Sequence, residues 1–256
     1  MSLKTGFNEC NNQEYHGDRS FYSSSALKIL LKDKYMFYRK YILNEKMEEK
    51  VNHNFTFGSL VHGLILEPHL VNEEFAVYSG SKNTEAFKEF KKQNKGKEII
   101  TPTAWQNGQF LLQRAQESSN FKFVQGGEPE KTLCGKLHGM PIKVRADYIG
   151  KDYILDVKTT SGNISDLYNI EKACANYGYA LSSALYFDMF KKKVPKLKRF
   201  LFWFINKQSG DEVLVQASEE FLEYGRKQYK EAIKIYKEAV KNDSWEDSLP
   251  LIYPKY

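Results

Sequence analysis

Cysteine is scarce in this sequence, and its scarcity excludes several classes of protein. Only three cysteines, Cys10, Cys134 and Cys174, occur among 256 residues. They are too few and too widely spaced for a disulfide framework or a zinc knuckle. The first 20 residues lack the apolar core of a secretory signal, and no charge-free stretch is long enough to span a bilayer. These absences predict a cytoplasmic protein without a membrane partner.

Wholesale disorder is excluded as well, because the chain has ample material for a core. Hydrophobic residues make up 41% of the sequence and aromatic residues 14%, as is typical of a globular protein. No internal repeat or low-complexity linker divides the chain. We therefore expect a single domain over residues 1–256, with a helical part at about 20–120, a sheet at about 130–217 and a last helix at about 218–242.

The net charge of +6 is small but unevenly distributed. Lysines cluster in "KKQNKGK" (91–97) and in "KKKVPKLKR" (191–199). Such clusters suit a polyanion such as nucleic acid. A single run of this kind is more simply explained as a solvated loop or helix end, so the charge pattern needs the support of a candidate site.

Helical spacing dominates the first half of the sequence. Serines precede apolar residues at helical spacing within 19–42, and a second helix within 57–70 ends at Pro68. Thr101 and Pro102 supply a cap and a first-turn proline for a third helix, which reaches about Ser118. Residues 79–98 are polar and lysine-rich, and fit an exposed loop, a weak helix or a mobile flap.

The apolar period changes to two after residue 130. Turn signals at 138–139 and 150–151 lie between alternating residues, which predicts a three-stranded meander over 131–160. A helix at about 171–190, strands at 199–207 and 211–217, and a helix capped by Ser218 follow, and the tail 249–256 is expected on the surface. This order predicts an α/β fold with a central mixed sheet, made of the meander and further strands, flanked by helices.

The meander contains the charged residues of greatest interest, in "VRADYIGKDYILDVKTT" (144–160). If residues 150 and 151 form a two-residue turn, Asp147, Asp156 and Lys158 share one face, and the apolar residues between them face the other layer. Asp147 and Asp156 are then diagonal neighbours, roughly 7–8 Å apart along the backbone. Two carboxylates so placed can hold one Mg²⁺ or Mn²⁺.

A structural ion-pair cluster explains the same residues. The same register places Arg145 directly across from Asp156, and Lys158 can neutralise either carboxylate. One Asp-x-Lys tripeptide also arises by chance in a chain as charged as this one. Geometry alone therefore leaves both the metal site and the ion-pair cluster open.

Four segments in order resemble the PD-(D/E)XK nuclease superfamily, and more narrowly its RecE-like and RecB-like exonucleases (exodeoxyribonuclease VIII-like). "FGSLVHGLILEP" (57–68) is similar to their G-x-x-x-H helix, and "VRADYI" with "ILDVKTT" to the strands that carry Asp and then Asp-x-Lys. "YGYALSSALYFD" (177–188) resembles the helix of a Q-x-x-x-Y motif, and residues 18–42 resemble the helical opening of phage RecE-type proteins. The resemblance covers about residues 15–205.

The resemblance implies a restriction-endonuclease-like core and a metal-dependent nuclease site. The implied catalytic residues are Lys158, Asp156 and Asp147. The implied ligands of one or two Mg²⁺ ions, which Mn²⁺ can replace, are His62, Asp147, Asp156 and the backbone carbonyl of Val157. Glu130, just before the meander, is a further candidate carboxylate. The residues expected to contact DNA are Tyr186, Ser182, Thr159, Lys191, Lys192 and Lys193.

One position departs from the family pattern. Ser182 stands where the motif has Gln, and serine cannot make the two-sided contact of an amide. This departure puts the substrate preference in doubt more than metal binding. His62 alone would more simply be a core histidine, and Tyr186 is also compatible with ordinary helix packing.

The implied activity is hydrolysis of linear double-stranded DNA, from 5′ to 3′, in phage recombination. The implied partners are double-stranded DNA ends, a single-strand annealing protein and further copies of the chain in a ring, in the host cell cytoplasm. A single-strand exonuclease or an endonuclease on the same fold is one alternative. A catalytically weakened DNA-binding or regulatory module is another, which Ser182 favours and the intact Asp147, Asp156 and Lys158 set disfavours. The third is an unrelated α/β domain with a structural ion-pair cluster.

Overall fold

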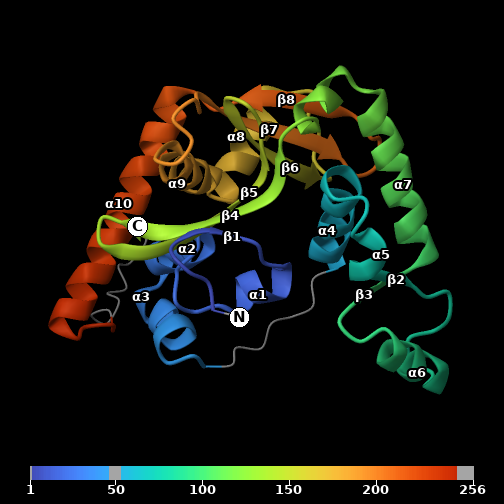
Figure 1. The fold of residues 1–256 in the computed structure, drawn as a ribbon, viewed down its shortest axis with the longest axis horizontal. Coiled ribbons are helices and arrows are strands. Elements are labelled where there is room, and N and C mark those ends of the chain that lie inside the picture. Colours follow the sequence, from blue (N-terminus) through green and yellow to red (C-terminus); the bar gives the residue numbers. More distant parts are fainter. Residues whose placement is uncertain (1, 46–52, 247–256) are drawn as a thin grey trace, which may run out of the picture.

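The protein has a mixed six-stranded sheet covered by helices on both faces (Figure 1). The computed structural model describes residues 2–45 and 53–246. The strand order is β1-β4-β5-β6-β7-β8, and all neighbours are antiparallel except β6 and β7, which are parallel. The strands of this sheet are β1 (Gly6–Asn8), β4 (Glu128–Leu137), β5 (Met140–Ile149), β6 (Tyr153–Thr160), β7 (Arg199–Asn206) and β8 (Glu212–Gln216). The predicted fold class is confirmed.

A small parallel pair, β2 (Phe75–Val77) and β3 (Glu98–Ile100), lies outside this sheet. The helices of the first half are α1 (Asn12–Gly17), α2 (Ser24–Lys32), α3 (Lys34–Phe37), η1 (Tyr38–Ile42), α4 (His53–Leu66), α5 (Val71–Glu74), α6 (Glu85–Gln93), α7 (Pro102–Glu117) and η2 (Ser119–Val124). Those of the second half are α8 (Leu167–Asn176), α9 (Tyr179–Lys191) and α10 (Glu219–Asn242).

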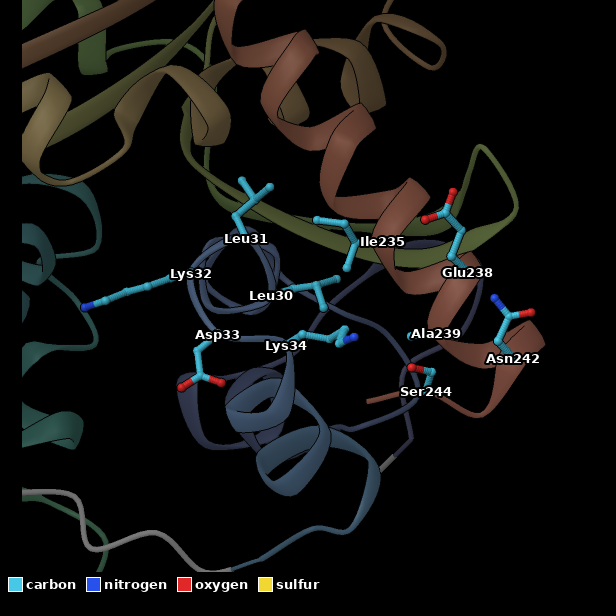
Figure 2. Close-up of a pocket in the computed structure, with 10 residues that line it drawn as sticks. All are labelled: Leu30, Leu31, Lys32, Asp33, Lys34, Ile235, Glu238, Ala239, Asn242 and Ser244. Atoms are coloured by element: carbon cyan, nitrogen blue, oxygen red, sulfur yellow. The ribbon is translucent and has the colours of Figure 1, made fainter. Parts of the chain in front are cut away.

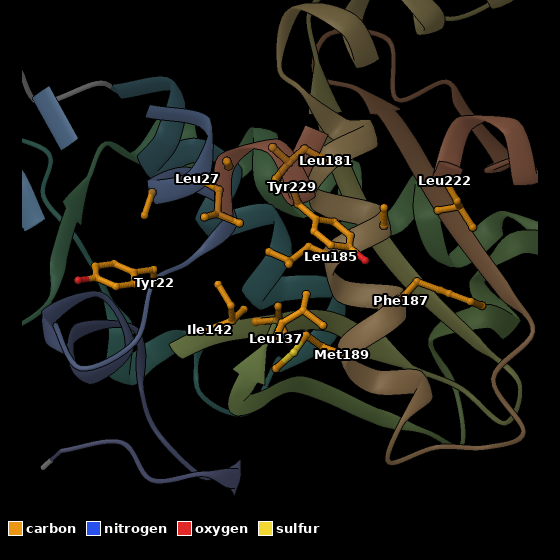
Figure 3. Close-up of a cluster of buried hydrophobic side chains, with 14 of the residues drawn as sticks. Tyr22, Leu27, Leu137, Ile142, Leu181, Leu185, Phe187, Met189, Leu222 and Tyr229 are labelled. Carbon is orange, nitrogen blue, oxygen red and sulfur yellow. The ribbon is translucent and has the colours of Figure 1, made fainter. Parts of the chain in front are cut away.

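The two faces of the sheet carry separate cores. Ile154 and Phe202 belong to the core under α2, α9 and α10, part of which is drawn in Figure 3. Leu155, Val157 and Trp203 belong to the core under α4 and α7. Because β7 is covered on both faces, its side chains are apolar in both directions, as the continuous run 199–207 predicts.

The meander forms, but with a different register from the predicted one. Tyr148 pairs with Leu155 and Ile149 with Ile154, so four residues, 150–153, connect the last paired positions instead of two. Gly150 closes this turn by donating its N–H to the Tyr153 carbonyl (2.9 Å). A two-residue shift keeps every side chain of β6 on its expected face. The predicted pairing of Asp147 with Ile154 is wrong.

The position of Arg145 is corrected too. Arg145 pairs with Thr132 of β4, and its guanidinium lies over the ring of Tyr15 at 4.3 Å. It donates to the Cys10 carbonyl and to Asn12 Oδ1, both at 2.8 Å. Arg145 therefore ties the N-terminal segment to the sheet, and Asp156 has a different cationic partner.

Lys143, two residues before Arg145, fastens the same segment. Its ammonium lies 4.9 Å from the centre of the Tyr15 ring and donates to the Asp18 carbonyl at 2.7 Å. Both cations are buried, so the segment supplies acceptors that water would otherwise supply. The sequence pattern did not predict α1 or β1, because both are too short to show a periodicity.

The helix predicted over 171–190 is divided in two. Gly178 has φ +61°, a left-handed conformation that ends α8 and lets α9 start in a new direction. The helix predicted from the serine cluster at 23–25 is divided at Asp33, which ends α2 and caps α3 by accepting from the Met36 N–H (2.7 Å). Within 79–98 the helical alternative holds, as α6, whereas the tail 249–256 lies outside the described residues.

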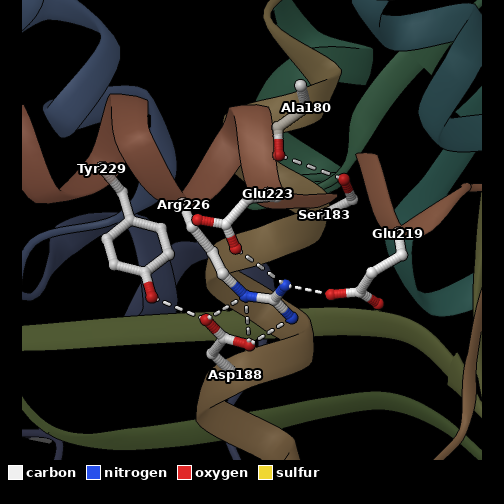
Figure 4. A network of polar contacts seen from close by, with 7 residues as sticks. All are labelled: Ala180, Ser183, Asp188, Glu219, Glu223, Arg226 and Tyr229. Atoms are coloured by element: carbon white, nitrogen blue, oxygen red, sulfur yellow. Dashed lines mark hydrogen bonds and ion pairs between the residues drawn. The ribbon is translucent and has the colours of Figure 1, made fainter. Parts of the chain in front are cut away.

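Helices α9 and α10 are held together by a charged network and by close backbone contact. Arg226 pairs with Asp188 (3.0 Å), which also accepts from the hydroxyl of Tyr229 at 2.6 Å (Figure 4). Gly225, the residue before Arg226, faces α9, where a Cβ would lie 1.9 Å from the Ala180 carbonyl oxygen. This contact fixes α9, the helix that lies over Asp156 and Lys158.

Candidate active site

The site forms where the regular pairing of β4 with β5 is interrupted. Their ladder pairs Lys131 with Ala146 and Pro129 with Tyr148, and passes over Glu130 and Asp147. Glu130 has φ +44°, which is unusual for a residue with a side chain. Ala146 and Tyr148, two positions apart, lie in opposite cores. The alternation of β5 therefore breaks at Asp147, although the register of the two strands is the same on both sides of the break.

This break turns the Asp147 side chain toward β6. Asp147 Oδ2 accepts the Val157 N–H at 2.8 Å, so a carboxylate satisfies a backbone donor that the β5–β6 ladder no longer reaches. Only the two residue pairs next to the turn make up that ladder. The separation of the strands beyond it leaves the side chains of Asp147 and Asp156 next to each other.

Three side chains from three elements form a group that could hold a metal ion. Potential ligand atoms of His62, Glu130 and Asp147 lie within 4.8 Å of one another. His62 comes from α4, and its Nδ1 is 3.5 Å from Asp147 Oδ2. Gly58, one turn earlier in α4, faces Thr159 of β6, where a Cβ would lie 3.4 Å from Thr159 Oγ1, an ordinary contact distance.

Asp156 and Lys158 lie beside this group and form an ion pair with each other. Asp156 is buried, and its Oδ1 accepts from the Lys158 ammonium. The ammonium also lies 5.4 Å from the centre of the Tyr179 ring of α9 and 3.4 Å from the Val157 carbonyl oxygen. The three-residue group contains Glu130, which was expected only as a further candidate, and Asp156, an expected ligand, lies beside it.

Burial and mutual repulsion shift the protonation of these groups. Burial, followed by the charge of Lys158, lowers the pKa of His62 to about 4, so the imidazole is neutral near pH 7 and can act as a ligand. Burial and the nearby Asp147 carboxylate raise the pKa of Glu130. Burial raises the pKa of Asp156 to about 7, with Lys158 opposing the shift and Asp147 adding to it.

Lys158 has the opposite balance. Burial lowers its pKa, but the carboxylates of Asp156 and Asp147 outweigh burial, so the net shift is upward. The side chain is therefore a permanent cation near neutral pH. Three carboxyl groups are therefore crowded beside one permanent cation, and a bound divalent cation would favour the ionised forms of Glu130 and Asp156, whose pKa values are raised.

The donor set fits a hard divalent cation. Two carboxylates and one neutral imidazole suit Mg²⁺ or Mn²⁺ better than a thiolate-seeking metal, and none of the described cysteines belongs to the group. The side chains of His62 and Asp147 are 25% and 15% exposed, so solvent and a ligand can reach them.

The residues expected to contact DNA are divided between two places. Tyr186 lies near the site: its hydroxyl is 3.4 Å from Ser24 Oγ, and burial, opposed by Ser24, raises its pKa to about 12, with Asp156 contributing. Thr159 follows Lys158 in β6 and is half-buried. Ser182 is buried, and its hydroxyl donates to the Gly178 carbonyl of its own helix (3.4 Å).

The lysines at 191–193 lie at the far end of α9 from Tyr179, on the order of 18 Å along the helix axis. Lys191 donates to the carbonyl of Pro195 at 3.0 Å and to that of Leu197. The structure therefore does not bring these lysines to the metal-binding group, and their contact with DNA stays a prediction.

Lys28 of α2 is a site residue that the sequence pattern did not reveal. Its ammonium lies 5.9 Å from the centre of the Tyr179 ring and donates to the Tyr177 carbonyl at 2.8 Å. Burial and the charge of Lys158 lower its pKa to about 8. Lys28 and Lys158 are 130 positions apart, and no local motif links them, so only the fold could show that they share a site.

A cavity of about 340 Å³ between α2 and α10 lies apart from these groups (Figure 2). It is lined by Leu30, Leu31, Lys32, Asp33, Lys34, Ile235, Glu238, Ala239, Asn242 and Ser244. None of the candidate ligands or catalytic residues is among them. The candidate chemistry therefore belongs to the partly open surface around Asp147 and not to this cavity.

A β-strand pair carrying Asp, then Asp-x-Lys, in a mixed sheet between helices defines the PD-(D/E)XK nuclease superfamily as the class of this fold. A family model described as "PDDEXK-like domain of unknown function (DUF3799)" matches residues 23–248. The chain belongs to this PDDEXK-like family, and the predicted superfamily is confirmed. The sequence has no significant match among curated proteins.

One solved structure supports the same fold. A crystal structure from Eubacterium rectale, of a protein provisionally named an exonuclease, aligns with a TM-score of 0.65 and 16% identity over 92% of this chain and 88% of its own. The structure of SSO0001 aligns at 15% identity over 85% of this chain and 86% of its own, with a TM-score of only 0.30. Among the described residues, no helix has the length and apolar character to cross a membrane.

Proposed function

We propose that this protein is a divalent-metal-dependent DNA exonuclease, with His62, Glu130, Asp147 and Asp156 around the metal and Lys158 as the catalytic cation. The observation that carries the proposal is the convergence of His62, Glu130 and Asp147 beside the buried pair of Asp156 and Lys158. Membership of the PDDEXK-like family and the likeness to a protein named an exonuclease support the proposal.

The proposed reaction is hydrolysis of a phosphodiester bond. A Mg²⁺ or Mn²⁺ ion bound there supplies Lewis-acid activation of the phosphate and a bound water of lowered pKa. His62, Glu130 and Asp147 would hold the cation, and Asp156 and the Val157 carbonyl would offer further oxygen ligands. Water becomes bonded to phosphorus, the bond to the sugar oxygen breaks, and that oxygen takes up a proton.

Lys158 has two roles in this proposal. Its ammonium neutralises Asp156 while the site is free, and it stabilises the negative charge that develops on the phosphate oxygens during attack. Tyr179 limits the positions of the ammonium from the α9 side. Tyr186 and Thr159 then lie beside the path of the DNA backbone, where contacts position the strand without reading its sequence.

Ends of linear duplexes are the proposed substrate, digested from 5′ to 3′ in a recombination pathway of phage type. The proposal includes a single nuclease domain, a single-strand annealing protein as partner, a homo-oligomeric ring and a cytoplasmic location. These finer statements rest on the resemblance of 57–68, 144–160 and 177–188 to RecE-like exonucleases, and each needs its own experiment.

The deciding experiment compares linear and covalently closed circular duplex DNA, with Mg²⁺ and with EDTA. We expect Mg²⁺-dependent loss of the linear DNA while circles stay intact. Nicking of circles would identify an endonuclease, and faster loss of single strands would identify a single-strand exonuclease. Failure to cut any DNA with Mg²⁺ or Mn²⁺, with binding retained, would leave the DNA-binding module as the better account.

The direction of digestion is tested with a linear duplex labelled at one 5′ end. Early release of labelled mononucleotide supports 5′-to-3′ digestion. Persistence of the label on long fragments while the duplex shortens contradicts that polarity.

A further inference from the structure

Three aromatic rings form a stack that runs from the core to the surface beside the candidate active site. Phe202 of β7 is buried, and its ring centre lies 5.8 Å from that of Tyr179 with 27° between the planes. The next ring is Tyr177, 5.6 Å from Tyr179 with 23° between the planes. Tyr177 is 64% exposed, so the outermost ring of the stack presents a free face to solvent.

Cations surround this stack. The Lys158 ammonium lies 5.4 Å and the Lys28 ammonium 5.9 Å from the centre of the Tyr179 ring. Lys28 also fixes the backbone next to the outer ring, because it donates to the Tyr177 carbonyl at 2.8 Å. A flat aromatic face beside fixed ammonium groups is complementary to a nucleotide, which has a π-face and an adjacent phosphate.

The spacing from the outer ring to the catalytic cation suits a short piece of one strand. The Lys158 ammonium and the centre of the Tyr177 ring are at most about 11 Å apart, from their two distances to Tyr179. At a rise of about 3.4 Å per base, that distance spans no more than about three nucleotides. A base on Tyr177 can therefore belong to the strand whose phosphate lies at Lys158.

We propose that Tyr177 is a stacking platform that positions a nucleobase of the DNA strand under attack. This inference rests on the proposed nuclease function and deepens it, because it adds a residue that sets where the strand is held. Tyr177 lies in the two-residue connection between α8 and α9, and the left-handed Gly178 directs its ring. Among the described ring contacts, Tyr177 stacks only with Tyr179. Packing within the protein therefore does not explain the exposed ring.

The test is a set of matched variants on a blunt duplex oligonucleotide with Mg²⁺. We expect Tyr177→Ala to raise KM by about 5- to 100-fold, the range for loss of one stacked base, with kcat nearly unchanged. Tyr177→Phe keeps the ring and should behave as the wild type. Tyr224→Ala removes an equally exposed tyrosine from α10 (59% exposed) and is the control. Tyr177→Ala keeps the carbonyl that Lys28 uses, so the variant isolates the ring.

A second arm identifies the base. The substrates are duplexes in which one abasic position is moved along the terminal nucleotides of each strand. The KM of the wild type should rise when the contacted base is missing. The KM of Tyr177→Ala should not change at that position. Equal KM for Tyr177→Ala and wild type, or the same abasic profile in both, would overturn the inference.

A binding arm separates this inference from the proposed function. In EDTA, 2-aminopurine at the contacted position should lose fluorescence on binding to the wild type and not on binding to Tyr177→Ala. This readout needs no cleavage, so a wild type that never cuts DNA contradicts the nuclease proposal while the fluorescence still decides the role of Tyr177. Equal quenching by both proteins would refute stacking on Tyr177.

Discussion

Asp156 and Lys158 form a buried ion pair whose two members differ in how firmly they hold their charge. Lys158 stays cationic because two carboxylates face it. Asp156 sits under the same burial and next to Asp147, and its pKa of about 7 places its protonation close to neutral pH. Near neutral pH, a proton and a divalent cation compete for this carboxylate.

The stability of the metal-free protein should therefore depend on the protonation of Asp156. The folded-state pKa is about 7 and the ordinary value is 3.8, so the folded state binds more protons between these pH values. By linkage, stability is greatest below about pH 4 on this account and falls as pH rises toward 7, by at most about 1.4 kcal/mol per pH unit. The check is urea unfolding in EDTA from pH 4 to 8, comparing wild type with Asp156→Asn.

The comparison isolates Asp156, because other shifted groups, such as His62, titrate in both proteins. The free-energy difference between wild type and Asp156→Asn should shift in favour of the variant as pH rises. A difference that stays constant across this range would contradict the raised pKa.

Replacing Lys158 tests the proposed chemistry at the scale of one residue. We expect Lys158→Ala to reduce cleavage by at least about 10²- to 10³-fold, the range seen when a stabilising donor for transition-state charge is lost. Single-turnover cleavage, DNA binding and the melting temperature should be measured together. Lys241→Ala, at an exposed position of α10, is the control. Cleavage by freshly purified Lys158→Ala at the wild-type rate would refute the role of Lys158.

Among the elements, α9 is placed with little freedom, because α10 touches its backbone at Gly225. A Cβ at this position would lie 1.9 Å from the Ala180 carbonyl oxygen, so α10 can pack this closely only with glycine there. The Asp188–Arg226 pair and Tyr229 then fix the two helices along their length. This packing sets where Tyr179 and Tyr186 stand over β6.

Gly225→Ala should thus destabilise the protein despite alanine's better helix propensity. The propensity gain is about 1 kcal/mol, whereas overpacking against backbone costs typically 1–3 kcal/mol or more. We expect a net loss of stability, measured by thermal and urea unfolding, and weaker cleavage because α9 shifts. Gly17→Ala is the control, since nothing lies within 4 Å of the added Cβ. Unchanged stability of Gly225→Ala would show that α10 can move freely away from α9.

The sequence predicted those elements whose signals are local. Alternation and turn residues predicted the meander, Thr101 and Pro102 predicted the start of α7, and the apolar run predicted β7. It could not predict the break at Asp147, because the break depends on the left-handed Glu130 in the neighbouring strand. The length of the β5–β6 connection is not fixed by the turn residues at 150–151, so the assumed two-residue turn gave the wrong register and placed Arg145 opposite Asp156.

For the candidate site, the sequence indicated most of the residues but not their geometry. The family resemblance pointed to His62, Asp147, Asp156 and Lys158, which the fold brings together. It gave Glu130 only as a further candidate, although Glu130 is one of the three converging groups. Lys28 was missed, because a contact between α2 and the α8–α9 connection leaves no trace in local spacing.

For the molecule as a whole, the site joins parts that are distant in sequence. His62 comes from α4, whereas Glu130 and Asp147 come from β4 and β5 of the central sheet. A ligand that binds all three would hold the helical part of residues 53–124 against the sheet. Binding would then stabilise the folded chain and not only the site.

We expect Mg²⁺ or Mn²⁺ to raise the free energy of unfolding by about 2.7 kcal/mol at an ion concentration 100 times Kd. Glu130→Gln keeps the shape of the side chain but removes its charge, so it should lose most of this stabilisation. The measurement is thermal unfolding in EDTA and in increasing Mn²⁺, with Glu231→Gln, at an exposed position of α10, as the control. An equal metal response in Glu130→Gln and wild type would remove Glu130 from the ligand set.

The family match begins at residue 23, yet Lys143 and Arg145 are buried only because Tyr15 and its neighbours cover them. A chain trimmed to the homology boundary would uncover both cations and leave the outer edge of β4 without its partner strand β1. A fragment designed for expression or crystallisation should therefore include the segment that covers Arg145 and should not start at the first residue of the family match. We therefore expect residues 2–22 to be required in the smallest stable fragment.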